Sequence, residues 1–140
     1  MPLVYYDIVR GRNHDQVRAL LDSTQAAIME AFGTPERDRY QLVTEHSPDE
    51  MIIQDNGLGI DRSDNIVFIH MINRRGRKTL AQKEKLYGLL ARNLKRDCGL
   101  DPADLVVVIT ENESEDFSIG YGKAQYVNGD IDPVTSRPRN

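Results

Sequence analysis

The arrangement of apolar and polar residues in the first half of the chain predicts a strand, a helix and a second strand. Residues 2–9, PLVYYDIV, are rich in β-branched and aromatic residues, which is typical of a strand. Apolar residues then recur at helical spacing over residues 14–32, with Asn13 as the expected N-cap and Gly33 as the expected stop. From Pro35, the sequence PERDRYQLVTE indicates a turn followed by a strand.

The same order starts again after residues 47–65, which are rich in turn residues. The next segment is NIVFIHMIN, a continuously apolar strand that the pattern predicts to be buried on both faces. Leucines at helical spacing follow over residues 79–97, with Thr79 as the cap and Gly99 as the stop. Residues 105–110 are the last predicted strand.

Four features recur in the same order in the two halves, 65 to 67 residues apart. They are an Arg-Gly-Arg turn after a strand, a glycine that ends a helix, a proline in the next turn, and a Thr-Glu pair at a strand end. The copies are Arg10-Gly11-Arg12 and Arg75-Gly76-Arg77, Gly33 and Gly99, Pro35 and Pro102, and Thr44-Glu45 and Thr110-Glu111. This pattern predicts a duplicated β-α-β unit, in which each crossover is right-handed and packs its helix on one face of the sheet.

We therefore expect an α/β (α+β) fold with one domain, residues 1–131, and repeats at about 2–64 and 65–128. The fold would be a four-stranded, mainly parallel sheet with two helices on one face, plus short hairpins. The other face then needs a cover, and in a chain of 140 residues the obvious cover is another copy of the protein. The polar tail, 132–140, is expected to be an arm or disordered.

Composition and charge exclude several classes of protein. The formal net charge of −4 gives no basic footprint for nucleic acid. The longest apolar run, residues 66–72, is too short to span a membrane, and the start of the chain lacks a signal-peptide pattern. The single cysteine, Cys98, allows no internal disulfide framework and fits a cytoplasmic protein. Three scattered histidines without partners at ligand spacing predict no metal site.

Pro2 directly follows Met1, and this position allows two interpretations. The initiator methionine is usually trimmed when the second residue is small, which would leave Pro2 with a free secondary amine. An α-amino group has a pKa of roughly 7.7–8.0, so it can act as an acid, a base or a nucleophile near neutral pH. Alternatively, Pro2 simply begins a strand, where proline is tolerated.

The second apolar strand ends in INRRGRKT, which brings together Arg74, Arg75 and Arg77. Open α/β sheets bind ligands at the carboxyl ends of their parallel strands, and guanidinium groups suit a carboxylate. Cations at a helix N-terminus oppose the helix dipole, unless an anion is bound there. A solvated basic turn is the alternative, because the matching Arg10 and Arg12 indicate that such a turn can be a feature of the repeat.

The other candidate residues have simpler structural interpretations. A charged run such as PERDRYQ is typical of a solvated loop, and tyrosines are typical of packing or rim positions. A histidine in an apolar strand is typically a satisfied core residue, and a lone cysteine is typically a small apolar residue. These residues are Asp38, Tyr40, Tyr121, Tyr126, His70 and Cys98. The segment GYGKAQY lacks a strand-then-helix context, so we interpret it as a Gly-bent strand or hairpin rather than a phosphate loop.

Taken together, Pro2, the duplicated unit and the arginines after the second apolar strand resemble the tautomerase superfamily, whose catalytic group is an amino-terminal proline. Four segments look most like its malonate semialdehyde decarboxylase family: FGTPERDRYQ, QDNGLGIDRS, RDCGLDPAD and ENESEDFSIGYGKAQYVNGD. The resemblance covers the chain from Pro2 to about Ile131. It implies a tautomerase/MIF-like fold, a homotrimer with sites between subunits, and no metal or organic cofactor.

The resemblance also implies roles for individual residues. Pro2 matches the catalytic proline, Asp38 the catalytic aspartate of the decarboxylase, and Arg74 its first substrate-binding arginine. The second arginine of the decarboxylase falls two residues later, where this sequence has Gly76. Arg77 instead resembles the second member of the Arg-x-x-Arg pair of cis-3-chloroacrylic acid dehalogenase and of some divergent decarboxylases. The catalytic histidine and glutamate of the dehalogenase have no clear match here.

Three further residues complete the candidate site. Phe117 stands where the decarboxylase has a tryptophan, so an aromatic wall is kept and the indole donor is lost. Tyr40 is the second wall candidate, and Arg75 is a third candidate for binding the substrate carboxylate.

The function implied is decarboxylation of malonate semialdehyde to acetaldehyde and carbon dioxide, with hydratase side activity. The alternatives are a keto–enol tautomerase, a hydratase or dehalogenase of unsaturated carboxylic acids, and a non-catalytic trimeric binding protein. A nearby arginine favours a neutral Pro2 amine, whereas Asp38 favours the cation. Without distances, the sequence leaves open whether Pro2 acts as an acid or as a base.

Overall fold

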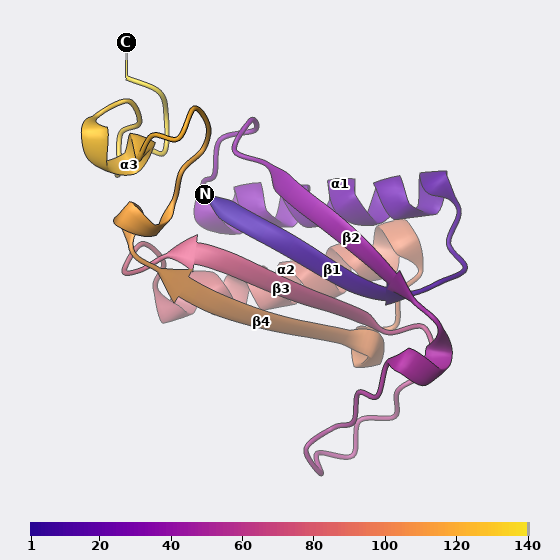
Figure 1. Ribbon diagram of the computed structural model, residues 1–140. Coiled ribbons are helices and arrows are strands. Elements are labelled where there is room, and N and C mark those ends of the chain that lie inside the picture. Colours follow the sequence, from indigo (N-terminus) through magenta and orange to yellow (C-terminus); the bar gives the residue numbers. More distant parts are fainter. Residues whose placement is uncertain (140) are drawn as a thin grey trace.

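Four strands form one sheet in the computed structural model, which describes residues 1–139 (Figure 1). They are β1 (Pro2–Val9), β2 (Tyr40–His46), β3 (Val67–Arg74) and β4 (Leu105–Asn112). The order across the sheet is β2-β1-β3-β4, with two parallel outer pairs and an antiparallel central pair. Each parallel pair belongs to one β-α-β unit, so the predicted duplicated unit and mainly parallel sheet are confirmed.

Two long helices lie side by side on one face of the sheet (Figure 1). They are α1 (His14–Phe32) and α2 (Leu80–Cys98). Each begins with a capping box, at Asn13 and Thr79, and ends at a left-handed glycine, Gly33 and Gly99, as the sequence predicted. Within residues 1–139, none of the helices combines the length and apolar character needed to cross a membrane.

The connections are short 3-10 turns and one short helix. They are η1 (Pro48–Glu50), η2 (Pro102–Asp104), η3 (Ser114–Asp116) and α3 (Gln125–Asn128). The predicted hairpin in GYGKAQY is reduced to an isolated antiparallel bridge between Gly120 and Lys123, because α3 begins immediately afterwards.

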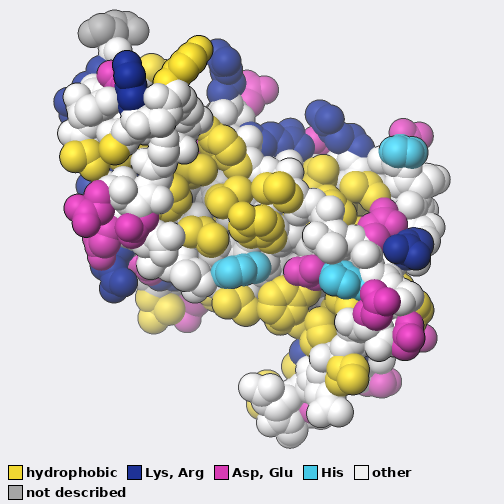
Figure 2. All heavy atoms as spheres, in the orientation of Figure 1, with side chains coloured by type: hydrophobic (Ala, Val, Ile, Leu, Met, Phe, Trp, Pro, Cys, Tyr) yellow, Lys and Arg dark blue, Asp and Glu magenta, His cyan; other side chains and the backbone are white. Residues whose placement is uncertain are grey.

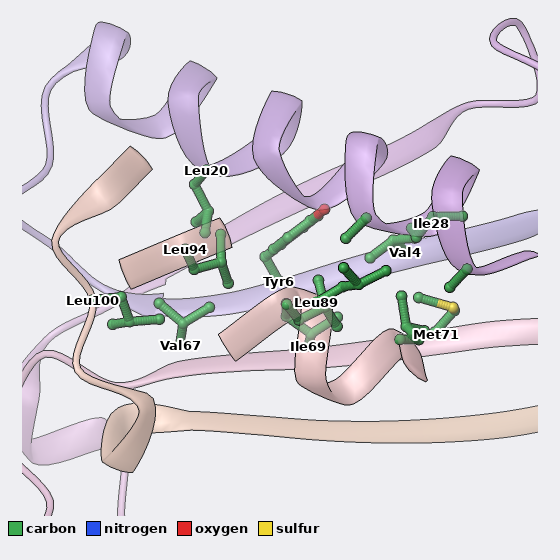
Figure 3. Close-up of a cluster of buried hydrophobic side chains, with 14 of the residues drawn as sticks. Val4, Tyr6, Leu20, Ile28, Val67, Ile69, Met71, Leu89, Leu94 and Leu100 are labelled. Carbon is green, nitrogen blue, oxygen red and sulfur yellow. The ribbon is translucent and has the colours of Figure 1, made fainter. Parts of the chain in front are cut away.

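Alternate residues of β1 and β3 point toward the helices and form the core (Figure 3). The buried core includes Val4, Tyr6, Ile69, Met71, Leu20, Ile28 and Leu94. The apolar run of β3 predicted burial on both faces, and this expectation is wrong for the single chain. Phe68, His70 and Ile72 stay partly exposed, because the second face of the sheet has no helix layer.

This second face presents apolar side chains (Figure 2). Tyr5, Leu42 and Val108 are exposed on strands β1, β2 and β4. His70 also lies here, with its Nε2 atom 2.8 Å from Thr110 Oγ1, so it is not the core histidine that its apolar surroundings predicted. The face is therefore available for contact with another protein surface.

The C-terminal segment folds back on itself as an arm (residues 131–139). Ile131 and Pro138 form an isolated bridge, and the Asp132 N–H donates to the Arg137 carbonyl at 2.8 Å. Of the two expectations for the tail, the described residues match an arm and not a disordered segment. Asn140 lies outside the described residues.

The turn between β3 and α2 is held by the end of β4. Gly76 has a φ of 70°, a left-handed conformation that glycine adopts at little cost. Its N–H donates to Glu111 Oε2 at 3.0 Å, and Glu111 Oε1 forms an ion pair with Lys83 of α2. Glu111 therefore ties the turn to the first part of the second helix.

Replacing Glu111 with glutamine tests this tie. The hydrogen bond from Lys83 and then the Gly76 N–H hold the pKa of Glu111 below its usual value of 4.5. Its contribution is thus present above pH 4.5 and is lost as the pH falls through the lowered pKa of the folded state. We expect Glu111→Gln to lower the free energy of unfolding by about 1 kcal/mol at pH 7. This difference from wild type should become smaller as the pH falls.

Urea titrations at several pH values measure this difference. Glu113→Gln is the matched control, because Glu113 pairs with Arg75 at the exposed side of the same turn. A gap between wild type and Glu111→Gln that is constant with pH would contradict the proposed tie.

Candidate functional site

The start of the chain and the end of β3 meet because β1 and β3 are antiparallel. Their register places Pro2 directly opposite Asn73. A cavity of about 410 Å³ opens at this end of the sheet. It is lined by residues 1–2, 32–35, 73–74, 76–78 and 134–137. The lining thus combines the N-terminus, the end of α1, the β3–α2 turn and the C-terminal arm.

The amino terminus is paired with Asp38, which lies in the connection between α1 and β2. The Met1 amine is 2.8 Å from Asp38 Oδ2, and both side chains are only 8% exposed. Burial lowers the pKa of this amine below its usual 8.0, Asp38 opposes that shift, and Arg74 and Lys78 add to it. In this form the Pro2 nitrogen is part of a peptide bond, so it has no basicity until Met1 is removed.

Arg74 is buried with unused hydrogen-bonding capacity. It is 4% exposed, and its Nη2 group donates to the Pro133 carbonyl at 2.8 Å and to Ser136 Oγ at 3.0 Å. The guanidinium carbon lies 4.1 Å from the centre of the Tyr126 ring, a cation–π contact. The Nε and Nη1 groups have no hydrogen-bond partner in the part of the chain that the structure describes. Burial is also the main cause that lowers the pKa of Arg74.

The unpartnered N–H groups of Arg74 give the cavity its chemistry. Buried polar groups in folded proteins are almost always hydrogen-bonded, and a buried guanidinium requires an acceptor or a counterion. A carboxylate supplies both, since each of its oxygens accepts charge-assisted hydrogen bonds. The arrangement can therefore hold a small carboxylic acid beside the first residues of the chain.

The neighbouring cations differ in their orientation. Arg77 lines the cavity, and its charge contributes to lowering the pKa of both Arg74 and Lys78. Arg75 is 65% exposed and pairs with Glu113 at 2.6 Å, away from the lining residues. The geometry therefore brings Arg74 and Arg77 together, and it does not bring Arg75 with them.

The two predicted wall residues do not line this cavity in the single chain. Phe117 packs edge-on against Tyr126, with ring centres 6.1 Å apart. It therefore contacts the ring that makes the cation–π contact with Arg74. The pKa of Tyr40 is raised by burial and by the Asp38 charge, which places Tyr40 in the surroundings of Asp38. Tyr126, which the sequence indicated only as a packing or rim residue, contacts the guanidinium group of Arg74 directly.

Several polar lining residues were not predicted from the sequence, among them Asn73, Lys78, Ser136 and Arg137. Lys78 donates to the Phe32 carbonyl at 3.0 Å and lies 5.1 Å from the Phe32 ring centre, and burial lowers the pKa of its amine. Asn73 and Lys78 flank the arginines in INRRGRKT, so their position was a usable signal. Nothing in the sequence connected the arm to Arg74.

The opposite end of the sheet has a larger hollow, of about 880 Å³, around the matching Arg10 and Arg12. Arg12 donates to Asn65 Oδ1 at 2.8 Å, and Arg10 lies 3.9 Å from Glu45. Three carboxylates also line this hollow, at Asp15, Asp64 and Asp97. Its arginines already have partners, and its lining within residues 1–139 does not include the first residues of the chain, so the smaller cavity is the candidate site.

Known proteins are similar to this chain in sequence and in fold. Two family models, each described as tautomerase enzyme, match residues 2–61 and 38–120. The probable tautomerase YrdN of Bacillus subtilis (strain 168) is 40% identical over 131 residues, which are 94% of this chain and 100% of that protein.

Solved structures are equally similar. A malonate semialdehyde decarboxylase, studied for its decarboxylase and hydratase activities, is 41% identical with a TM-score of 0.88, over 92% of this chain and 98% of that one. FG41 malonate semialdehyde decarboxylase, inhibited by 3-bromopropiolate, is 36% identical with a TM-score of 0.88, over 93% and 98% of the two chains. The chain therefore belongs to the tautomerase superfamily of cofactor-independent isomerases and lyases.

Proposed function

We propose that this enzyme decarboxylates a small 3-oxo acid, with malonate semialdehyde as the substrate, to give acetaldehyde and carbon dioxide. One observation carries the proposal: Arg74 is buried beside the first residues of the chain, and its Nε and Nη1 nitrogens have no acceptor within residues 1–139. A carboxylate bound there would satisfy them. The likeness to two malonate semialdehyde decarboxylases, at 41% and 36% identity, supports this substrate.

The active form has Pro2 as its first residue. Removal of Met1 turns the Pro2 nitrogen from a tertiary amide into a secondary amine. Because Met1 and Pro2 both line the cavity, the new amine stays within it and near the Asp38 carboxylate. We assign Pro2 and Asp38 the catalytic roles, and Arg74 and Arg77 the binding of the carboxylate.

In the reaction, the bond between the carboxylate carbon and C2 breaks. The electron pair of this bond forms the C2–C3 double bond, while the C3–O π pair moves to the oxygen. A cationic Pro2 stabilises the developing oxyanion by a hydrogen bond. A proton then returns to C2. In the covalent alternative, a neutral Pro2 amine first condenses with the C3 carbonyl and releases water. The resulting iminium takes up the electron pair as an enamine, and after C2 is protonated, water hydrolyses the iminium to acetaldehyde and free Pro2. Arg74 and Arg77 hold the carboxylate so that the breaking bond is aligned with the carbonyl π system.

Hydration of an unsaturated carboxylic acid is the second candidate activity. The positions of Arg74 and Arg77 favour it, since the two arginines are three residues apart in the sequence, as in the Arg-x-x-Arg pair of the dehalogenase, and both line the cavity. Asp38 would then position the water, and a cationic Pro2 would donate the proton. A keto–enol tautomerase would use the same residues, with a neutral Pro2 as the base.

The functional unit we propose is a homotrimer that buries the uncovered sheet face. Tyr5, Leu42 and Val108 are exposed on that face, and Ile52 and Leu58 are exposed on the loop that projects beyond it (Figure 1). A fold relative, fused 4-OT, forms a symmetric trimer. Two or more copies would remove these side chains from water.

The carboxylate-binding pair can be tested with an internal control. On protein whose mass confirms Met1 removal, we expect Pro2→Ala to abolish carbon dioxide and acetaldehyde release from malonate semialdehyde. Arg77→Gln should lower kcat/KM about 10- to 100-fold, because it removes a charge-assisted hydrogen bond. Arg75→Gln is the matched control and should stay within about 3-fold of wild type, because Arg75 pairs with Glu113 outside the cavity.

No turnover by the mature wild-type protein would contradict decarboxylation. Turnover of propiolate or 3-haloacrylates in the same assay would then support hydration.

The pH profile separates acid from base catalysis. The same buried surroundings that lower the pKa of the Met1 amine should also lower the pKa of the Pro2 amine. Because the cation is the form used in decarboxylation, kcat/KM should be constant at low pH and fall as the pH rises through this pKa. In Asp38→Asn, which lacks the opposing charge, the fall should begin at lower pH. A kcat/KM that rises with pH would indicate a neutral proline base.

The oligomer can be measured by analytical ultracentrifugation. We expect three times the mass of the 15.9 kDa chain for wild type. Val108→Lys should dissociate the assembly, because it places an unpaired charge on the apolar sheet face. Tyr87→Lys, an exposed position on α2, is the control and should leave the mass unchanged. A monomeric wild type would contradict the trimer.

A further inference from the structure

Asn73 is a second buried group of the cavity that lacks a partner. It is 4% exposed, and its Nδ2 amide has no hydrogen-bond acceptor among the described residues, 1–139. The register of β1 and β3 places it directly opposite Pro2, and both residues line the cavity. Opposite residues of an antiparallel pair have their side chains on the same face, with Cβ atoms roughly 4.5–5.5 Å apart.

Among the residues that the structure describes, Asn73 Nδ2 is the asparagine amide nitrogen that is fully buried without a partner. The other buried asparagine, Asn93 of α2, is 3% exposed and accepts a hydrogen bond from the side chain of Arg92. An unpaired buried amide destabilises the folded protein, whereas a leucine of similar volume would not. The amide of Asn73 therefore fits a group whose acceptor arrives with a ligand.

Strand geometry separates the two unpartnered groups of the cavity. Successive side chains of a strand point to opposite faces, so Asn73 and Arg74 approach from different sides of the sheet. Arg74 is held on one side by Ser136 of the arm and by Tyr126. Asn73 lies on the helix side, opposite Pro2. A ligand held by Arg74 at its carboxylate would thus meet Asn73 and Pro2 at its other end.

We propose that Asn73 is a catalytic residue that donates a hydrogen bond from Nδ2 to the 3-oxo oxygen of the substrate. This role rests on the function proposed above. As the carboxylate leaves, its bonding pair moves through C2–C3 and the carbonyl π pair moves to this oxygen. Asn73 stabilises the resulting enolate oxygen without changing its own protonation state. It also gives the site a preference for 3-oxo acids over acids without an oxygen at C3.

Two readouts test the assignment, on protein that lacks Met1. In Asn73→Leu, kcat for malonate semialdehyde should fall about 100-fold, as when one oxyanion donor is removed. Calorimetric titration with 3-oxobutanoate and butanoate should show that wild type binds the oxo acid about 5-fold more tightly, and that Asn73→Leu binds the two equally. The affinity for butanoate should not change, because Arg74 and Arg77 remain.

Thermal melting separates this role from a structural one. The melting temperature of Asn73→Leu should equal or exceed that of wild type, because the substitution removes an unpaired buried amide. Asn93→Leu is the matched control, and its kcat should stay at the wild-type value because Asn93 lies on α2 outside the cavity. If Asn73→Leu does not fold, Asn73→Ala gives the same two readouts.

The possible failures are distinguishable. A preference for 3-oxobutanoate that persists in Asn73→Leu, or a kcat within about 3-fold of wild type, would overturn the role of Asn73 alone. A large fall in melting temperature with unchanged kcat would show a structural role instead. Wild-type protein that binds neither acid would overturn the carboxylate site, and the role of Asn73 with it.

Discussion

The antiparallel pairing of β1 with β3 is the constraint on which the site depends. Each β-α-β unit is parallel within itself, and the two units join through this one pair. The pairing places the first residues of the chain against the last residues of the third strand, at Pro2 and Asn73. A terminal amine and a set of arginines that are far apart in the sequence therefore meet at one end of the sheet.

Duplication produced two similar turns, and the rest of the chain made them different. Arg10 and Arg12 have partners in Glu45 and Asn65, at the end of the sheet away from Pro2. At the other end, the C-terminal arm accepts hydrogen bonds from Arg74, and the ring of Tyr126 makes a cation–π contact with the guanidinium group of Arg74. The arm buries the guanidinium group of Arg74, whereas an ordinary basic turn is solvated. The free N–H groups of Arg74 therefore need an acceptor.

The sequence was sufficient for the architecture because local signals agreed with the duplication. Capping residues and helix-ending glycines act within one turn of the chain, so Asn13 and Gly33 could be interpreted without a structure. The orientation of Arg75 and Arg77 could not, because it depends on the left-handed Gly76 and on its bond to Glu111 of another strand. The contact of Ser136 with Arg74 joins residues 62 apart in the sequence, with no periodic pattern between them.

The cavity has a surplus of positive charge, and this surplus links binding to catalysis. Arg74, Arg77 and Lys78 line it, whereas Asp38 is the nearby carboxylate that pairs with the terminal amine. Arg74 and Lys78 disfavour a proton on the amine, which burial already disfavours. A carboxylate bound to Arg74 would offset part of their field. Substrate binding should therefore raise the pKa of the amine, and so favour the cationic form that decarboxylation requires.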